Sequence, residues 1–288
     1  MQSLSLPSPG KVNLRLEVIG KRPDGFHELR SLMERVNIAD EIEMKIVEKG
    51  ITVSCDDESV PCDENNIAFK AVKEILAYSS RNVGVDIKIK KQIPVAAGMG
   101  GGSSNAATVI KGINHLLKLK LSKEKLMKIG LKVGADVPFF LFEGPALAEG
   151  IGEQLKKIKA MPRLLFLIAN PNIPVRTEWV YGKYSLEAPK GNGHCEVPNA
   201  YRTKKDVAKI LHNDLERVTI KEYPVIGEIK EEMLKLGALA SQMTGSGPTV
   251  FGIFADKVKL QKAYERMEKK AAKGWKIFMA ENLEESKG

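Results

Sequence analysis

A glycine-rich stretch, Pro94 to Leu117, holds the residues of this 288-residue chain that are best suited to bind an anion. Gly98 and Gly100 to Gly102 fill four of five consecutive positions, and Ser103 and Ser104 follow. Glycines allow backbone N–H groups to face a ligand closely, and a helix that follows adds the positive end of its dipole. Four apolar residues then recur at helical spacing: Ala106, Ile110, Ile113 and Leu117. The stretch predicts a phosphate-binding loop followed by a helix, with the two serines as its caps.

The loop does not match the two common phosphate-binding motifs. A Walker motif requires Gly-Lys followed by Ser or Thr, and no Gly-Lys pair of this chain has either residue next. The GxGxxG pattern fails at its last position, where Ser103 replaces glycine. On local grounds alone, a flexible turn before a helix remains the alternative.

Lys11 and Asn13 place two polar groups on one face of a predicted strand. Apolar residues alternate with them: Val12, Leu14, Leu16 and Val18. This period of two is typical of a half-buried strand. A turn, Lys21 to Gly25, follows, and Phe26 and His27 begin a second extended run. A surface hairpin with an exposed histidine is the alternative interpretation.

Asp136 is a carboxylate in a constrained position. Ser122 is suited to cap a helix, and Gly134 ends that helix shortly before the apolar run Val137 to Phe140. An Asp among apolar neighbours is either a cap or turn residue or a catalytic group at a pocket wall. The local sequence leaves both possibilities open.

The rest of the first half predicts a mixed α and β domain. Strands are expected at residues 41–47, 51–54 and 85–89, and a short hairpin connection, Glu48 to Gly50, joins the first two. Asn66 to Leu76 carries apolar residues at helical spacing and predicts a helix.

The second half predicts another mixed region. A buried strand is expected at Leu164 to Ala169, and a mobile loop, Gly182 to Lys205, precedes a helix from Asp206 to about Val218. A further helix, near Pro224 to Leu236, leads to a glycine-rich turn, Met243 to Pro248, between two strands. That turn places small backbone groups beside a ligand or beside the first glycine loop, unless it is a simple hairpin turn.

Composition indicates a soluble globular protein, because 43% of the residues are hydrophobic and 28% are charged. We expect one large domain or two moderate ones, with a boundary near residues 150 to 162. No apolar run is long enough to span a bilayer and the N-terminus lacks a signal-peptide pattern, so the cytoplasm is the expected location. Cys55, Cys62 and Cys195 lack metal-ligand spacing and are expected to be buried or incidental thiols. The net charge of +9 favours a solvated basic surface, with nonspecific nucleic-acid binding as the alternative.

Three motifs taken together resemble the signatures of the GHMP kinases, the superfamily of galactokinase, homoserine, mevalonate and phosphomevalonate kinases. They are Ser8 to Leu14, Pro94 to Ala107 and Met243 to Phe254. Three further stretches are similar to the members that phosphorylate a cytidine diphosphate sugar alcohol: Arg22 to Leu29, Gly134 to Phe140 and Ala146 to Glu153. The resemblance covers essentially the whole chain.

This resemblance implies an α+β fold of two domains. Residues 1–155 would form an N-terminal, ribosomal-S5-like ATP-binding domain and residues 156–288 a C-terminal ferredoxin-like domain, with ATP and substrate meeting in the cleft. It implies an ATP-dependent kinase for the 2-hydroxyl of the erythritol moiety, in the non-mevalonate route to isoprenoid precursors. ATP and Mg²⁺ would be the cofactors. No nucleic-acid or membrane partner and no separate metal site are expected.

The same resemblance implies roles for individual residues. Asp136 would be the general base that accepts the hydroxyl proton, and Lys11 the cation that keeps Asp136 ionised and steadies the transferring phosphoryl group. The ATP-binding residues would be Asn66, Lys91, Pro94, Gly98, Gly100, Gly101, Gly102, Ser103 and Ser104. The substrate-binding residues would be Asn13, Phe26, His27, Thr177 and Tyr181.

In the implied substrate pocket, His27 would hydrogen-bond the edge of the cytosine base. Phe26 and Tyr181 would stack on its two faces, and Asn13 and Thr177 would line the diphosphate and erythritol path. The family usually has Tyr where this chain has Phe26, so stacking is kept while any hydroxyl contact is lost.

Two alternatives remain open at this stage. One is a GHMP kinase for another small alcohol of the homoserine or mevalonate type, against which the stretch Pro23 to Leu29 argues. The other is a non-catalytic RNA-binding protein with an S5-like domain, which would need neither Lys11 nor Asp136.

Overall fold

The computed structural model describes residues 2–79, 81–187, 196–270 and 274–283, which divide into two compact units. The first unit comprises Met1–Gly10, Ile38–Val95 and Gly100–Glu143; the second comprises Lys11–Asn37, Ala96–Met99 and Gly144–Gly288. Two long strands, β1 (Ser3–Lys21) and β2 (His27–Val47), each contribute to both units. Within the described residues, no helix combines the length and apolar character needed to cross a membrane.

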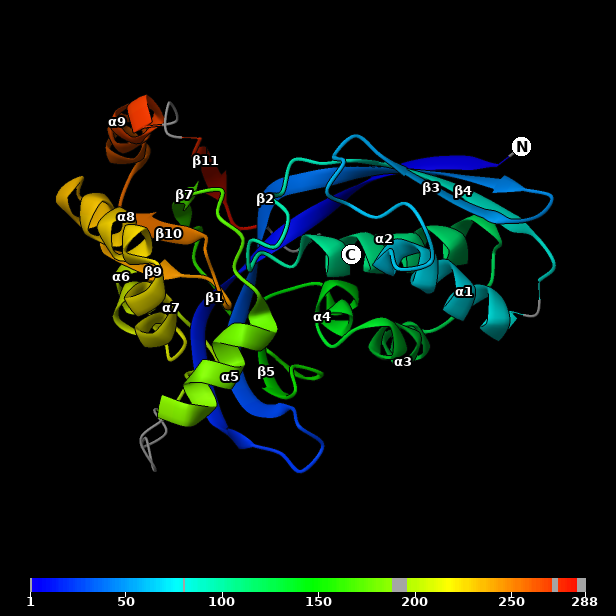
Figure 1. Cartoon of the computed structure of the whole chain (residues 1–288), viewed down its shortest axis with the longest axis horizontal. Helices are drawn as coiled ribbons and strands as arrows, with labels where there is room; N and C mark the ends of the chain where they lie inside the picture. Colours follow the sequence, from blue (N-terminus) through cyan, green and yellow to red (C-terminus); the bar gives the residue numbers. More distant parts are fainter. Residues whose placement is uncertain (1, 80, 188–195, 271–273, 284–288) are drawn as a thin grey trace. The chain divides into compact units, whose positions relative to one another are not determined.

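The first unit is a sheet with helices packed on it (Figure 1). Its strand order is β3-β4-β2-β1, where β3 (Ile51–Cys55) runs parallel to β4 (Gly84–Lys90) and β4 antiparallel to β2. The helices are α1 (Ile67–Ser79), α2 (Gly101–Leu116), α3 (Lys123–Val133) and α4 (Val137–Phe142). Helix α1 packs on α2, and α3 and α4 pack against this pair. The predicted helices at 66–76 and after Ser122 are confirmed, since Ser122 accepts a hydrogen bond from the N–H of Lys125.

The predicted hairpin at Glu48 to Gly50 is wrong. The strands on either side of it exist, but β4 lies between them in the sheet, so β2 and β3 are not hydrogen-bonded neighbours. The reason is that β3 pairs with β4 instead, starting at Ile51 and Val85, and the backbone of Gly84 lies close to that of Gly50. A short connection in sequence therefore does not make a pair in space.

The predicted serine caps of α2 are also wrong. The helix begins at Gly101, and its N-cap is Gly100 in the left-handed region, at φ 68°. Glycine adopts this conformation without strain, and it supplies no side chain to cap the helix. Ser103 and Ser104 consequently lie within the first turns of α2, where the Ser104 hydroxyl accepts a hydrogen bond from Ser8.

The second unit contains a four-stranded antiparallel sheet with the order β11-β7-β10-β9. Its strands are β7 (Leu165–Asn170), β9 (Ala240–Met243), β10 (Val250–Phe254) and β11 (Lys276–Glu281). Helix α8 (Pro224–Lys235) packs against β9 and β10, while α9 (Lys257–Glu268) packs against β7 and β11 (Figure 1). The strand expected at 164–169, the helix at 224–236 and the glycine-rich turn between two strands are confirmed.

Shorter elements complete the second unit. The strands β5 (Ala146–Gly150), β6 (Gln154–Lys157) and β8 (His212–Asn213) extend the parts of β1 and β2 that belong to it. The remaining helices are α5 (Thr177–Glu187), α6 (Lys204–Lys209) and α7 (Glu216–Glu222). Both units mix helices with strands, so the predicted α+β class is confirmed.

Two predictions for this region need correction. Gly182 lies inside α5 rather than at the start of a loop, and residues 188–195 of that predicted loop, Cys195 included, lie outside the described residues. The helix expected at 206–218 is broken into α6, β8 and α7. The break falls at Asn213, whose side chain accepts from the N–H of Leu215 and thereby competes with helical hydrogen bonding.

We expect Gly84→Ala to lower the free energy of unfolding by about 1–3 kcal/mol, because overpacking forces backbone shifts. A Cβ atom there would lie 2.3 Å from the carbonyl oxygen of Gly50, which is backbone and cannot rotate away. Urea denaturation measures the change. Gly20→Ala is the matched control, because a Cβ at Gly20 meets nothing within 4 Å. An equal effect of the two substitutions would contradict this explanation.

Candidate functional site

Lys11 lies in the second unit at the meeting point of segments that are far apart in the sequence. Its ammonium group donates to Asn13 Oδ1 at 2.5 Å and to the carbonyl oxygen of Gly98 at 2.8 Å. Its backbone N–H donates to the carbonyl oxygen of Met99 at 2.9 Å. Lys11 is buried. The side-chain oxygen of Asn13 and the carbonyl oxygen of Gly98 thus help to fix the position of the ammonium group.

The second glycine-rich turn joins this group through Thr244. The Thr244 hydroxyl accepts from the backbone N–H of Asn13 at 2.9 Å, and it lies 3.1 Å from Asn13 Oδ1 and 3.3 Å from the Gly98 carbonyl oxygen. Gly98 has φ 73°, and a Cβ atom there would lie 2.2 Å from the carbonyl oxygen of Thr244. Only glycine meets both requirements. The turn is thus a hairpin between β9 and β10, as one interpretation held, and it also lies beside the first loop, as the other held.

Asn213, which was not predicted as a site residue, holds the second glycine-rich turn through hydrogen bonds to its backbone. Its amide donates to the carbonyl oxygens of Met243 and Gly245, both at 2.8 Å. Glu216 Oε1 accepts from the N–H of Met243 at 2.7 Å. An Asn-Asp pair in the middle of a predicted helix was the available signal, because both residue types favour turns.

The residues expected to bind substrate lie on the same unit. Thr177, the first residue of α5, has its hydroxyl 2.9 Å from that of Ser246 in the turn. One helical turn later, the ring of Tyr181 faces His27 with 5.0 Å between centroids and 32° between planes. Phe26 is 58% exposed. The structure therefore brings Tyr181 together with His27 and leaves Phe26 open to solvent.

His27 has a pKa below its ordinary value. Partial burial is the larger cause, and the positive charge of Lys21 is the second. Both effects disfavour the imidazolium form. The ring is therefore neutral at pH 7 and carries one N–H donor and one acceptor.

In the first unit, Lys91 and the expected ATP-binding residues 100–104 lie at the start of α2. Lys91 Nζ would lie 3.2 Å from a Cβ atom at Gly101, so its ammonium group is beside the first turn of that helix. Lys91 forms a buried ion pair with Asp40. Asn66 acts as a cap of α1, because its Oδ1 accepts from the N–H of Ala68 at 2.8 Å.

The other loop residues of this unit differ in exposure. Pro94 and Ser104 are buried, Gly100, Gly101 and Ser103 are half-buried, and Gly102 is exposed. The N-terminal turn of α2, exposed at Gly102, offers backbone N–H groups to an anion.

Asp136, also in the first unit, is the N-cap residue of α4. Its carboxylate is half-buried and makes no capping hydrogen bond with that helix. The interpretation of Asp136 as a cap residue is therefore confirmed for its position in the backbone. The side chain is not used for capping.

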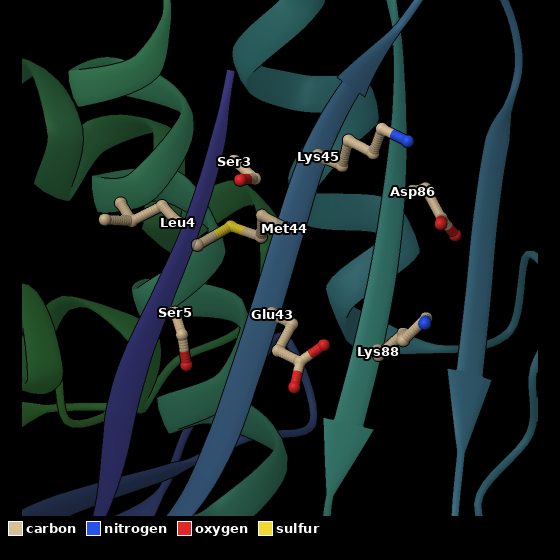
Figure 2. A pocket seen from close by; sticks show the side chains of 8 residues that line it. All are labelled: Ser3, Leu4, Ser5, Glu43, Met44, Lys45, Asp86 and Lys88. Carbon is tan, nitrogen blue, oxygen red and sulfur yellow. The ribbon is translucent and has the colours of Figure 1, made fainter. Parts of the chain in front are cut away.

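A hollow of about 360 Å³ lies on the first unit (Figure 2). It is lined by Ser3, Leu4, Ser5, Glu43, Met44, Lys45, Asp86 and Lys88. These residues come from β1, β2 and β4, and the charged ones alternate in sign across the strands. None of the predicted site residues lines it, so this hollow is separate from the candidate site. Among the residues that the structure describes, no three His, Cys, Asp or Glu side chains converge in a way that could hold a metal ion.

The comparisons with known proteins match both parts of the chain. Residues 66–144 match the model of the GHMP kinases N terminal domain, and residues 200–273 match that of the GHMP kinases C terminal domain. The 4-diphosphocytidyl-2-C-methyl-D-erythritol kinase of Geobacter metallireducens is 53% identical over 88% of this chain and 90% of its own length. The protein of the same name from Pelobacter propionicus is 48% identical over 98% of this chain and its whole length.

Solved structures give the same result for the fold. A crystal structure of 4-(cytidine 5'-diphospho)-2C-methyl-D-erythritol kinase aligns with a TM-score of 0.80, at 28% identity, over 98% of this chain and all of the other. Homoserine kinase from Cytophaga hutchinsonii aligns with a TM-score of 0.75 at 20% identity, covering all of this chain and 96% of its own. The second likeness concerns the fold alone. The chain therefore belongs to the GHMP kinases and, within them, to the family of 4-diphosphocytidyl-2-C-methyl-D-erythritol kinases.

Proposed function

We propose that this chain transfers the γ-phosphoryl group of ATP to the 2-hydroxyl of 4-diphosphocytidyl-2-C-methyl-D-erythritol, a step of the non-mevalonate route to isoprenoid precursors. The relatives that carry this name support the choice of substrate. The observation that carries the proposal is the Lys11 group, in which Asn13, Gly98 and Thr244 bring all three kinase motifs to one ammonium ion.

The chemistry divides among these residues as follows. The backbone N–H groups from Gly98 to Ser104 hold the ATP phosphates, with Asn66, Lys91 and Pro94 toward the adenosine end. Lys11 stabilises negative charge on the transferring phosphoryl group. Asp136 accepts the proton of the substrate hydroxyl, which a carboxylate not used for capping can do.

On the substrate side, Asn13 and Thr177 line the path of the diphosphate and the erythritol. His27 reads the edge of the cytosine, and the rings of Tyr181 and Phe26 stack on its faces. In support, Tyr181 already packs against His27, and Phe26 has more than half of its surface available to a ligand.

Mg²⁺ is the expected companion of ATP, and it would neutralise phosphate charge. Because Mg²⁺ keeps water ligands and takes others from substrate phosphates, it needs at most one or two protein ligands, and no residue is assigned to it here. Ser104 fits this role poorly, since its hydroxyl is fully buried and already engaged by Ser8.

The wider proposal includes residues 1–155 as the ATP-binding domain and residues 156–288 as the C-terminal domain. Its partners are ATP and a cytidine diphosphate sugar alcohol, without nucleic acid or membrane. The cytoplasm is its expected location. Homoserine, mevalonate and RNA remain as controls.

Asp136→Asn is expected to lower kcat by about 10²–10⁴-fold, the usual contribution of a general base. Release of ADP is measured with ATP, Mg²⁺ and 4-diphosphocytidyl-2-C-methyl-D-erythritol, while calorimetry checks that ATP still binds. Homoserine and mevalonate serve as control acceptors and should be inert. Turnover of a control acceptor in place of the cytidine compound would contradict the proposed substrate, and an unchanged kcat would contradict the role of Asp136.

Tyr181→Ala is expected to raise KM for the cytidine substrate by about 10- to 100-fold, because stacking of a base on an aromatic ring contributes about 1–3 kcal/mol. KM for ATP should stay within about twofold. Tyr78→Ala is the control, since Tyr78 is an exposed tyrosine of the first unit to which no role is assigned. Equal effects of the two substitutions on KM would refute the stacking role.

Lys21→Met is expected to raise the pKa of His27 toward its ordinary value without fully restoring it, because burial remains. Titration of the imidazole protons by NMR follows the change, with His27→Gln to assign the signal. In the wild type, KM for the cytidine substrate should be constant above the lowered pKa and rise as the pH falls through it. A His27 pKa at or above the ordinary value would contradict this prediction.

A further inference from the structure

Asp40 is a fully buried carboxylate with four hydrogen-bond donors around it. Its Oδ1 accepts from the backbone N–H groups of Gln92 and Ile93, both at 2.9 Å. Its Oδ2 accepts from the side-chain amide of Asn105 at 2.9 Å and pairs with the ammonium group of Lys91. The side chain of Asp40 is 0% exposed and that of Lys91 is 8% exposed. Nothing in the proposed reaction uses this carboxylate.

The partners of Asp40 stand on both sides of the glycine-rich loop. Lys91, Gln92 and Ile93 come immediately before Pro94, where the loop begins. Asn105 lies in the second turn of α2, which the loop enters. One carboxylate therefore ties the entrance of the loop to its exit.

A second layer of hydrogen bonds extends this network to β1. The amide of Asn105 also donates to the Ser8 hydroxyl at 2.9 Å, and Ser8 donates to the Ser104 hydroxyl at 2.9 Å. Ser8 and Ser104 are both 0% exposed. The positions of the first residues of α2 are thus set by buried polar contacts that lead back to Asp40.

Stability alone is a weak reason for such a carboxylate. Removing two charges from water is costly, and a buried ion pair contributes little net stability compared with apolar residues of similar volume. What the pair provides is a defined geometry. We infer that Asp40 is a positioning residue for ATP: it holds the two ends of the glycine-rich loop, and the ammonium group of Lys91, in the arrangement that receives the phosphates.

The effect on ATP follows from the composition of the loop. Glycines have more backbone freedom than other residues, so ordering a segment with two glycines in the loop and two in the first turn of α2 costs conformational entropy. A loop whose ends are already fixed loses less entropy when its N–H groups close on phosphate. Asp40 therefore strengthens the binding of ATP and leaves the acceptor substrate unaffected. This inference rests on the proposed function, since it takes ATP to be the ligand of the loop.

The substitution that tests the inference is Asp40→Asn. It keeps a carbonyl oxygen for Gln92 and Ile93 but presents an N–H₂ group to Asn105 and Lys91, which are themselves donors. We expect KM and the calorimetric dissociation constant for ATP to rise at least about tenfold, the scale of a lost charge-assisted hydrogen bond. KM for the cytidine substrate should change by less than about threefold.

Two further variants separate positioning from general destabilisation. Ile75→Val removes a methyl group from a fully buried side chain of α1, and it should lower Tm without changing KM for ATP. Asn105→Ala removes one donor from Asp40, and it should raise the dissociation constant for ATP by a smaller factor than Asp40→Asn does. It decides the matter if Asp40→Asn does not fold.

Calorimetry on the wild type distinguishes a failure of the proposed function from a failure of the inference about Asp40. A wild-type protein that fails to bind ATP would overturn the proposed function. A wild type that binds ATP, together with an Asp40→Asn variant that binds it within about twofold, would overturn the inference alone. If the variant bound ATP and the cytidine substrate equally more weakly, and this weakening matched the loss of Tm, the inference would also be overturned.

Discussion

The buried ammonium group of Lys11 is the interaction on which the proposed chemistry depends. A buried cation is costly unless hydrogen-bond acceptors surround it. Here Asn13 and the carbonyl oxygen of Gly98 supply them, and Thr244 holds both of these acceptors in place. The requirement for glycine at position 98 follows, because the carbonyl oxygen of Thr244 occupies the space of a Cβ atom. Residues of three motifs, spread over more than two hundred residues of the chain, thus together position one ammonium group.

The two glycine-rich segments are fixed by different means. Asp40 holds the first through four donors, and Asn213 holds the second through the carbonyl oxygens of Met243 and Gly245. Both are buried polar side chains on strands, Asp40 in β2 and Asn213 in β8. Phosphoryl transfer is mainly a matter of alignment and charge neutralisation, so rigid support for flexible glycines has a direct chemical purpose.

Much of this could be predicted from local patterns in the sequence. The alternation around Lys11 correctly predicted a strand, and the spacing of apolar residues predicted α1, α2 and α8. The wrong hairpin and the broken helix share one physical cause, which is that partners distant in sequence decide the outcome. Strand β4 separates β2 from β3, and Asn213 bonds the distant turn instead of continuing a helix. Asp40 sits in an ordinary strand sequence, so only the folded structure reveals its four donors.

Lys11 is proposed to act on the transferring phosphoryl group rather than on the binding of ATP or substrate. This role is tested most directly by the single-turnover rate of Lys11→Met with ATP and the cytidine substrate both saturating. We expect a rate lower by at least about 100-fold, as for the loss of one preorganised donor, with both dissociation constants within about threefold of the wild type. A rate near that of the wild type, or a loss explained entirely by weaker binding, would contradict it.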